Sequence, residues 1–110
     1  MTTRARRAAE RYVELVNAVD LEGLAALFAP DATLLHPTGV YDGRDAIRAF
    51  YAESVVVFAP EVVATSWVEA DEHCVFEMEA RAGGEAVAQA IDRVTVDAGG
   101  AITRLAIYFR

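Results

Sequence analysis

The sequence predicts an α+β domain in which three N-terminal helices pack on a curved antiparallel sheet, a cone-shaped barrel that encloses an apolar pocket. In the first half of the chain, apolar residues recur at helical spacing. In the second half, apolar and polar residues alternate with period two, and turn residues divide this half into strands. No linker-like stretch separates the halves, so the 110 residues, 55% of them hydrophobic, are expected to form one domain, residues 1–110.

Apolar positions at steps of three and four residues predict the three helices. The first covers residues 4–19, and Tyr12 lies on its apolar stripe. Asp20 is well placed to cap a second helix over residues 21–28. The third helix covers residues 44–54.

Five segments are predicted to be strands. The segment DATLLHPTG, residues 31–39, is a short strand that runs into a turn, and a loop from Gly39 to Gly43 follows it. The other strands cover residues 61–70, 73–82, 85–97 and 101–109. Gly83-Gly84 and Gly99-Gly100 supply the hairpin turns between the last three.

Composition excludes several classes of partner. The formal net charge of −7 and the pI near 4.7 would repel phosphate backbones and anionic lipids, so neither nucleic acid nor membrane is expected to bind. No segment resembles a signal peptide or a membrane span, which predicts a cytoplasmic protein. One Cys and two His at unrelated spacings do not make a metal site. All ten basic residues are Arg, which suggests a bacterial gene of high GC content.

Asp92 is the most informative residue of the predicted sheet. It interrupts an apolar strand face formed by Ala86, Ala88, Ala90, Val94 and Val96. A carboxylate on a buried face must be paired, or it stays protonated with a raised pKa. No Lys exists and no Arg lies in an obvious inward phase, so a neutral carboxylic acid in a pocket is predicted. The alternative is an edge-strand Asp that reaches water.

Tyr12, His36 and Asp92 are the polar groups predicted to point inward. Tyr and a protonated Asp donate hydrogen bonds, and a neutral imidazole accepts a proton. Enolisation needs such a set, because a base removes a proton next to a carbonyl while donors stabilise the charge on its oxygen. The Tyr12 and Asp92 oxygens are therefore expected within hydrogen-bond reach of each other, with His36 across the pocket. Taken singly, Tyr12 is equally explained as a core residue, and His36 as a structural residue bonded to a backbone carbonyl.

The segments RYVELVNAVDLEGLAALFAPDAT, HPTG, AIRAFY and AIDRVTVD resemble successive parts of the ketosteroid isomerase family, within the nuclear transport factor 2-like, SnoaL-like superfamily. The resemblance covers nearly the whole chain. It implies that Tyr12 and a neutral Asp92 form the oxyanion hole, a feature for which this family is known. It also implies that Tyr51 hydrogen-bonds the oxyanion-hole Tyr.

The chain departs from the family at two positions, His36 and Phe28. His36 of HPTG stands where the family has its general base, an Asp before Pro. Phe28 replaces a further Tyr of the hydrogen-bond network, and Phe109 falls where an aromatic residue often lines the pocket. Because the superfamily also includes cyclases, epoxide hydrolases, dehydratases and proteins without known catalysis, fold alone does not decide the activity.

The resulting hypothesis is a cofactor-free isomerase that moves a double bond in a small hydrophobic carbonyl compound, with a 3-oxo steroid as one candidate and His36 as the base. The alternatives are a hydratase, dehydratase or cyclase in the same pocket, or a non-catalytic module that binds a small ligand. Six residues are predicted to line the pocket: Phe28, Leu34, Phe50, Tyr51, Phe76 and Phe109. The outer sheet face is predicted to carry Val87, Ile91 and Trp67. Members of the resembled family are commonly dimers through this face, so a homodimer is expected.

Overall fold

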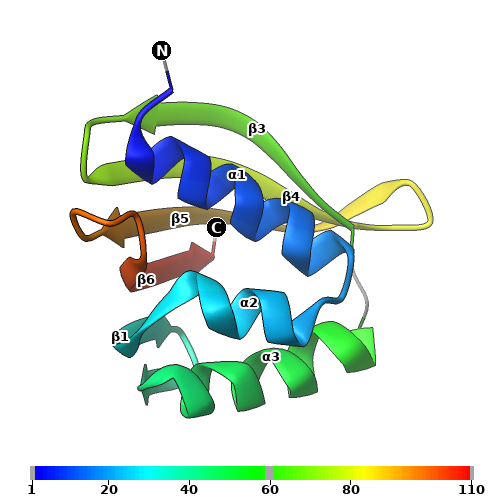
Figure 1. The fold of residues 1–110 in the computed structure, drawn as a ribbon. Helices are drawn as coiled ribbons and strands as arrows, with labels where there is room; N and C mark the ends of the chain where they lie inside the picture. The colour runs from blue at the N-terminus through cyan, green and yellow to red at the C-terminus, as the bar shows by residue number, and fades with distance from the viewer. Residues whose placement is uncertain (1, 59–60, 110) are drawn as a thin grey trace.

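The computed structural model describes residues 2–58 and 61–109, with side chains described for all of these except residues 55–58. In chain order the elements are α1 (Arg4–Asn17), α2 (Leu21–Leu27), β1 (Phe28–His36), β2 (Gly39–Asp42), α3 (Arg44–Phe58), β3 (Glu61–Glu69), β4 (His73–Ala82), β5 (Glu85–Val96) and β6 (Ile102–Phe109). The three helices cover one face of a curved, unclosed sheet (Figure 1). The predicted fold class is therefore confirmed.

The sheet is mixed and not wholly antiparallel as predicted. Its strand order is β2-β1-β6-β5-β4-β3, and β1 pairs with β6 in parallel. The last four strands form an antiparallel meander, as expected. The final strand of this meander returns beside β1 in the same direction, which period-two alternation cannot reveal.

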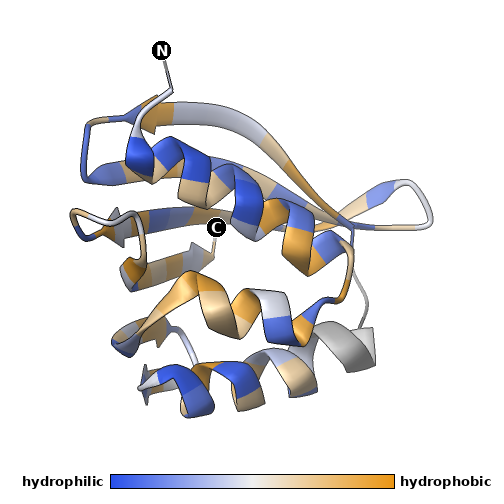
Figure 2. Cartoon of the chain, in the orientation of Figure 1, coloured by the Kyte–Doolittle hydropathy of each residue, from blue (hydrophilic) through white to orange (hydrophobic). Residues whose placement is uncertain are grey.

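Local capping sets the boundaries of the first two helices. The Asp20 side chain accepts a hydrogen bond from the Gly23 N–H, which confirms it as the cap of α2. Val19 adopts the left-handed conformation with φ 54°, so α1 ends at Asn17, two residues earlier than predicted. Phe28 is extended and begins β1 in place of ending α2. Figure 2 shows hydrophobic and hydrophilic residues alternating along α1, and Tyr12 lies on its buried side.

Three further boundaries differ from those predicted. The segment expected as a loop forms the short strand β2, because Pro37 and Thr38 make a tight turn that lets His36 pair with Gly39. The strand β1 begins three residues early, and α3 continues to Phe58. The glycine turns are confirmed: φ is +61° at Gly83, +84° at Gly84 and +89° at Gly100, values that favour glycine.

Trp67 faces the core, so its predicted place on the outer face is wrong. A β-bulge between Ala64 and Ser66 shifts the register of β3 against β4 and reverses the phase of the residues after it. The Trp67 ring stacks on Phe76 with centroids 4.9 Å apart, and the Arg6 guanidinium lies 4.3 Å from the Trp67 ring centroid.

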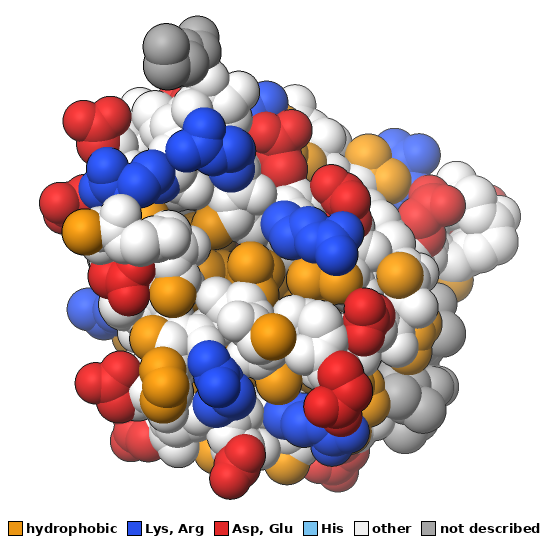
Figure 3. Space-filling model, in the orientation of Figure 1, with side chains coloured by type: hydrophobic (Ala, Val, Ile, Leu, Met, Phe, Trp, Pro, Cys, Tyr) orange, Lys and Arg blue, Asp and Glu red, His pale blue; other side chains and the backbone are white. Residues whose placement is uncertain are grey.

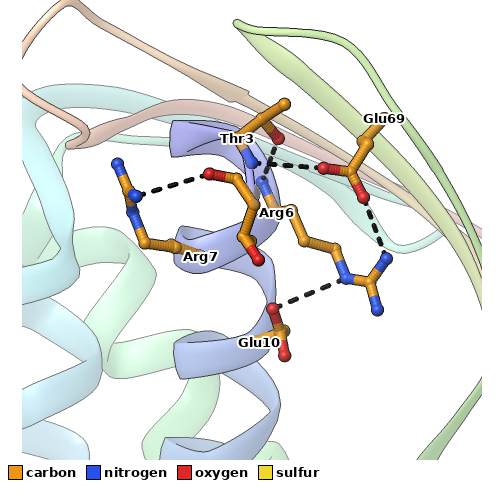
Figure 4. Close-up of polar contacts among 6 residues, drawn as sticks. Thr3, Arg6, Arg7, Glu10 and Glu69 are labelled. Atoms are coloured by element: carbon orange, nitrogen blue, oxygen red, sulfur yellow. Dashed lines mark hydrogen bonds and ion pairs between the residues drawn. The ribbon is translucent and has the colours of Figure 1, made fainter.

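Polar contacts join the start of α1 to the end of β3 (Figure 4). The Arg6 guanidinium donates to Glu69 at 2.9 Å, and the Thr3 backbone N–H donates to the same carboxylate at 3.2 Å. The Thr3 hydroxyl caps the helix by accepting from the Arg6 N–H at 3.1 Å. These contacts hold α1 across the sheet and so fix where its buried stripe points.

Charged side chains of both signs are interspersed over the helical face (Figure 3). None of the helices in the described part of the chain is long and apolar enough to cross a membrane.

Candidate functional site

An apolar cavity lies between the helices α1 and α3 and the concave face of the sheet. Its inner part has a volume of about 150 Å³, and an outer part of about 480 Å³ opens from it, within the usual range for small-molecule sites. The two parts share four lining residues: His36, Phe50, Ser54 and Phe109. Tyr12, His36 and Asp92 all line the inner part, so the structure brings the three predicted polar residues together.

Asp92 lies on the inward face of β5, between Phe76 of β4 and Ile107 of β6 in the strand register. Its side chain is completely buried, and neither carboxyl oxygen has a hydrogen-bond partner among the described residues. Burial raises its pKa from 3.8 to about 7. The predicted phase of the strand holds from Ala88 to Val96, whereas Ala86 is exposed in the β4–β5 hairpin, which extends past the helices (Figure 1).

Tyr12 of α1 and Tyr51 of α3 form a hydrogen-bonded pair beside Asp92. Their hydroxyl oxygens are 2.7 Å apart, and their rings meet edge to face with centroids 5.9 Å apart. Burial is the largest cause that raises the pKa of both phenols, and the Asp92 charge adds to it. Both hydroxyls therefore stay protonated at neutral pH. One of the two hydroxyl protons forms the hydrogen bond between Tyr12 and Tyr51, and the other hydroxyl proton is free to be donated to another acceptor.

The expected close approach of the Tyr12 and Asp92 oxygens is not found. Asp92 has no hydrogen-bond partner within the described parts of the chain, and the Tyr12 hydroxyl is turned toward Tyr51. The two groups remain close enough for the Asp92 charge to raise the pKa of Tyr12.

His36 ends β1 at the junction of the inner and outer parts of the cavity. Its ring lies between Phe50, at a centroid distance of 4.9 Å, and the edge-on ring of Phe109, at 5.2 Å. Partial burial lowers its pKa from 6.5. The Nδ1 atom is 2.8 Å from the Thr38 hydroxyl oxygen and accepts from the Thr38 backbone N–H at 3.2 Å. Thr38 Oγ1 is in turn 2.8 Å from the Tyr41 hydroxyl. In the described part of the chain both partners of Nδ1 belong to Thr38, and neither is a backbone carbonyl.

The six predicted lining residues fall into two groups. Phe50, Tyr51 and Phe109 line the cavity. The other three are fully buried in the core and are not among the lining residues: Phe28, Leu34 and Phe76. Phe28 lies behind Tyr51 with centroids 6.5 Å apart, and Phe76 lies behind Tyr12 at the same separation, so both are placed to support the tyrosine pair.

Sequence reasoning missed several lining residues that have visible signals. Val16 follows Tyr12 by one helical turn, Met78 and Ala80 continue the strand face of Phe76, and Ile107 precedes Phe109 by two residues. Ser54 lies on α3 in the part shared by the inner and outer cavities. Thr38, Tyr41 and Glu53 line only the outer part, and their place depends on the unpredicted strand β2 and the orientation of α3.

Within the described residues, no three His, Cys, Asp or Glu side chains come close enough to hold a metal ion. Cys74 is a free, buried thiol, and His73 makes a 3.1 Å contact with Thr95.

The raised pKa of Asp92 predicts a specific pH dependence of stability. Below pH 3.8 the group is protonated in both the folded and the unfolded chain; above it the unfolded chain releases a proton that the folded chain keeps up to about pH 7. The stabilisation from the neutral carboxyl is thus lost as pH rises toward and through 7, by on the order of 4 kcal/mol.

We expect the difference in the free energy of unfolding between wild type and Asp92→Asn to fall by about 4 kcal/mol between pH 4 and pH 8. Urea denaturation at a series of pH values measures it, and the Asn variant removes the contributions of all other groups. Parallel curves for the two proteins would show that Asp92 titrates normally.

Comparison with known proteins identifies the family of the chain. The family model described as SnoaL-like domain matches residues 9–105. A steroid Δ-isomerase of Nocardioides simplex is 34% identical over 113 residues, covering 99% of this chain and 92% of that protein.

Two solved structures share the fold. A Kribbella flavida protein aligns with a TM-score of 0.86 at 24% identity, covering 99% of this chain and 88% of that one. RV0760c of Mycobacterium tuberculosis was solved in complex with estradiol-17β-hemisuccinate. It aligns with a TM-score of 0.82 at 18% identity, covering 99% of this chain and 95% of that one. From the family match and the Nocardioides relative, the chain belongs to the SnoaL-like domain family.

Proposed function

We propose that the protein is a cofactor-free isomerase that moves a double bond in a small hydrophobic carbonyl compound by proton transfer. The observation that supports this most is the placement of a buried carboxyl of raised pKa and a buried tyrosine pair in one apolar cavity with His36. Membership of a family that includes a steroid Δ-isomerase supports chemistry of the isomerase or cyclase type.

The proposed reaction uses groups with distinct tasks. A base in the cavity removes the proton from the carbon next to the carbonyl, and negative charge grows on the carbonyl oxygen. Tyr12 donates a hydrogen bond to that oxygen while Tyr51 donates to Tyr12, so that the pair acts as one extended donor. Return of the proton to another carbon moves the double bond. Apart from the tyrosine pair, His36 and Asp92 are the titratable groups among the described residues that line the inner cavity, so one of them is the base.

The lining favours a neutral, largely apolar substrate. Among the described residues that line the two parts of the cavity, none is Arg or Lys, so a carboxylate or phosphate would be left without a counter-charge. The names of the Nocardioides relative and of the RV0760c complex support a steroid as the first compound to test. Hydration or dehydration is the second candidate, because Thr38, Tyr41 and Ser54 give the outer part hydroxyl groups that could hold a water.

The first test removes the proposed oxyanion donor. Tyr12→Phe keeps the packed ring and deletes the hydroxyl, so we expect kcat on a β,γ-unsaturated 3-oxo steroid to fall by about 10²- to 10³-fold. Tyr51→Phe acts only through Tyr12 and should cost less. The rate is followed by the absorbance of the conjugated enone product.

Tyr108→Phe is the matched control, because Tyr108 of β6 does not line the cavity and the variant keeps its ring on the outer sheet face, so the activity should equal that of wild type. Unchanged activity in Tyr12→Phe would exclude it as the donor. A wild type that binds the steroid without converting it would favour the non-catalytic binding module, and a product that has gained or lost water would favour the second candidate.

We further propose that the protein works as a cytoplasmic homodimer joined through the outer face of the sheet. Val87, Ile91 and Tyr108 are exposed there, and Ile91 lies opposite Tyr108 in the β5–β6 register. Such a cluster is more apolar surface than a small monomer usually exposes. Light scattering at micromolar concentration should give twice the chain mass for wild type and the monomer mass for Ile91→Glu. A monomeric wild type would contradict the proposal.

A further inference from the structure

The hydrogen bonds at His36 restrict which ring nitrogen can carry its proton. A backbone N–H can only donate, and that of Thr38 donates to Nδ1 at 3.2 Å. A proton on Nδ1 would point at this N–H, so Nδ1 must keep its lone pair. The neutral imidazole then carries its proton on Nε2. The Thr38 hydroxyl, 2.8 Å from Nδ1, is free to donate to the same lone pair or to Tyr41.

This tautomer makes His36 a poor proton acceptor. Its lone pair is already occupied by Thr38, and Nε2, the other ring nitrogen, bears a hydrogen and so cannot take one. Charging the ring would also set an imidazolium between the apolar rings of Phe50 and Phe109, at the cost of hydration. A neutral imidazole in this state is a hydrogen-bond donor.

Asp92 has the opposite properties. Both of its oxygens are buried, and all of their lone pairs are without partners in the described structure. The groups near it are the phenols Tyr12 from α1 and Tyr51 from α3, and the apolar Phe76 from β4 and Ile107 from β6. His36 lies on the same cavity, and Glu53 lies on its outer part. A carboxylate without a cationic partner in such a site is a strong proton acceptor.

We propose that the two roles are exchanged relative to those implied by the family resemblance: Asp92 is the catalytic base, and His36 is a neutral donor that binds a substrate oxygen through Nε2–H. This inference rests on the proposed proton-transfer function. It makes Thr38 a positioning residue, because its backbone N–H sets the tautomer of His36.

The proton that Asp92 removes from one carbon is the proton that it returns to another, so no net proton is consumed. The Asp92 carboxylate takes the proton from the carbon next to the carbonyl, and the electrons of that C–H bond form the carbon–carbon double bond of an enolate. The hydroxyl of Tyr12 and the Nε2–H of His36 are the available donors for its oxygen. The neutral Asp92 acid then returns the proton to a different carbon, which moves the double bond and restores the carboxylate.

Two NMR measurements on the ligand-free protein test these assignments without any substrate. Imidazole ¹⁵N shifts should show neutral His36 as the Nε2–H tautomer, with His73 distinguished by its loss in His73→Gln. Thr38→Val deletes the hydroxyl but keeps the backbone N–H, so the tautomer should persist. Carboxyl ¹³C shifts should show Asp92 ionised by pH 8. An Nδ1–H tautomer, or an Asp92 that stays protonated at pH 9, would overturn the proposal.

Steroid isomerisation by two conservative variants then ranks the roles. His36→Gln retains an N–H donor but cannot accept a proton, and Asp92→Asn keeps the shape and a donor but removes the base. We expect His36→Gln to keep measurable activity with a kcat/KM that still rises with pH near 7, and Asp92→Asn to lose about 10²- to 10⁴-fold relative to wild type. The reverse order would restore His36 as the base. Wild type that is inactive while both NMR results hold would reject the proposed isomerase and leave the protonation states standing.

Discussion

The whole site is organised around the carboxyl group of Asp92, which has no hydrogen-bond partner among the residues that the structure describes. A carboxyl without hydrogen bonds on a buried strand face opposes folding whenever it is ionised, and the core around it must offset that cost. An apolar residue would fill the same position without this penalty. The combination of a destabilising polar group and a cavity beside it is typical of a site selected for binding or chemistry.

The fold supplies the environment of this group from elements distant in the sequence. The helix α1 brings Tyr12, α3 brings Tyr51, and the parallel pairing of β1 with β6 brings His36 beside Phe109. Because Phe28 and Phe76 are completely buried behind the tyrosines, the hydroxyl pair rests on packed rings. Tight packing of this kind allows a donor to be aimed before substrate binds, which is the basis of electrostatic preorganisation.

Much of this arrangement could be predicted from residue patterns alone. Strand phase placed Asp92 inward, helical spacing placed Tyr12 on a buried stripe, and glycine pairs located the hairpin turns. Trp67 could not be placed, because a single bulge inverts the phase of every residue after it. The parallel β1–β6 pair depends on long-range pairing that no local pattern encodes. The strand β2 forms locally, through the tight turn at Pro37 and Thr38, but its four residues are too few for a clear alternation of apolar and polar residues. The hydrogen bond from the Thr38 backbone N–H to His36 decides how the imidazole can act, and it depends on the exact backbone geometry of the turn after β1, which residue types alone do not specify.

The proposed reaction requires that the cavity moves a proton to and from the carbon next to a carbonyl. Deuterium exchange measures this step alone, because exchange at that carbon requires proton removal even if the double bond never moves. A 3-oxo steroid incubated in D₂O with the protein should gain deuterium next to its carbonyl much faster than in buffer, and Asp92→Ala should reduce the rate toward that of buffer. Exchange by wild type no faster than in buffer, with steroid shown to be bound, would contradict the account.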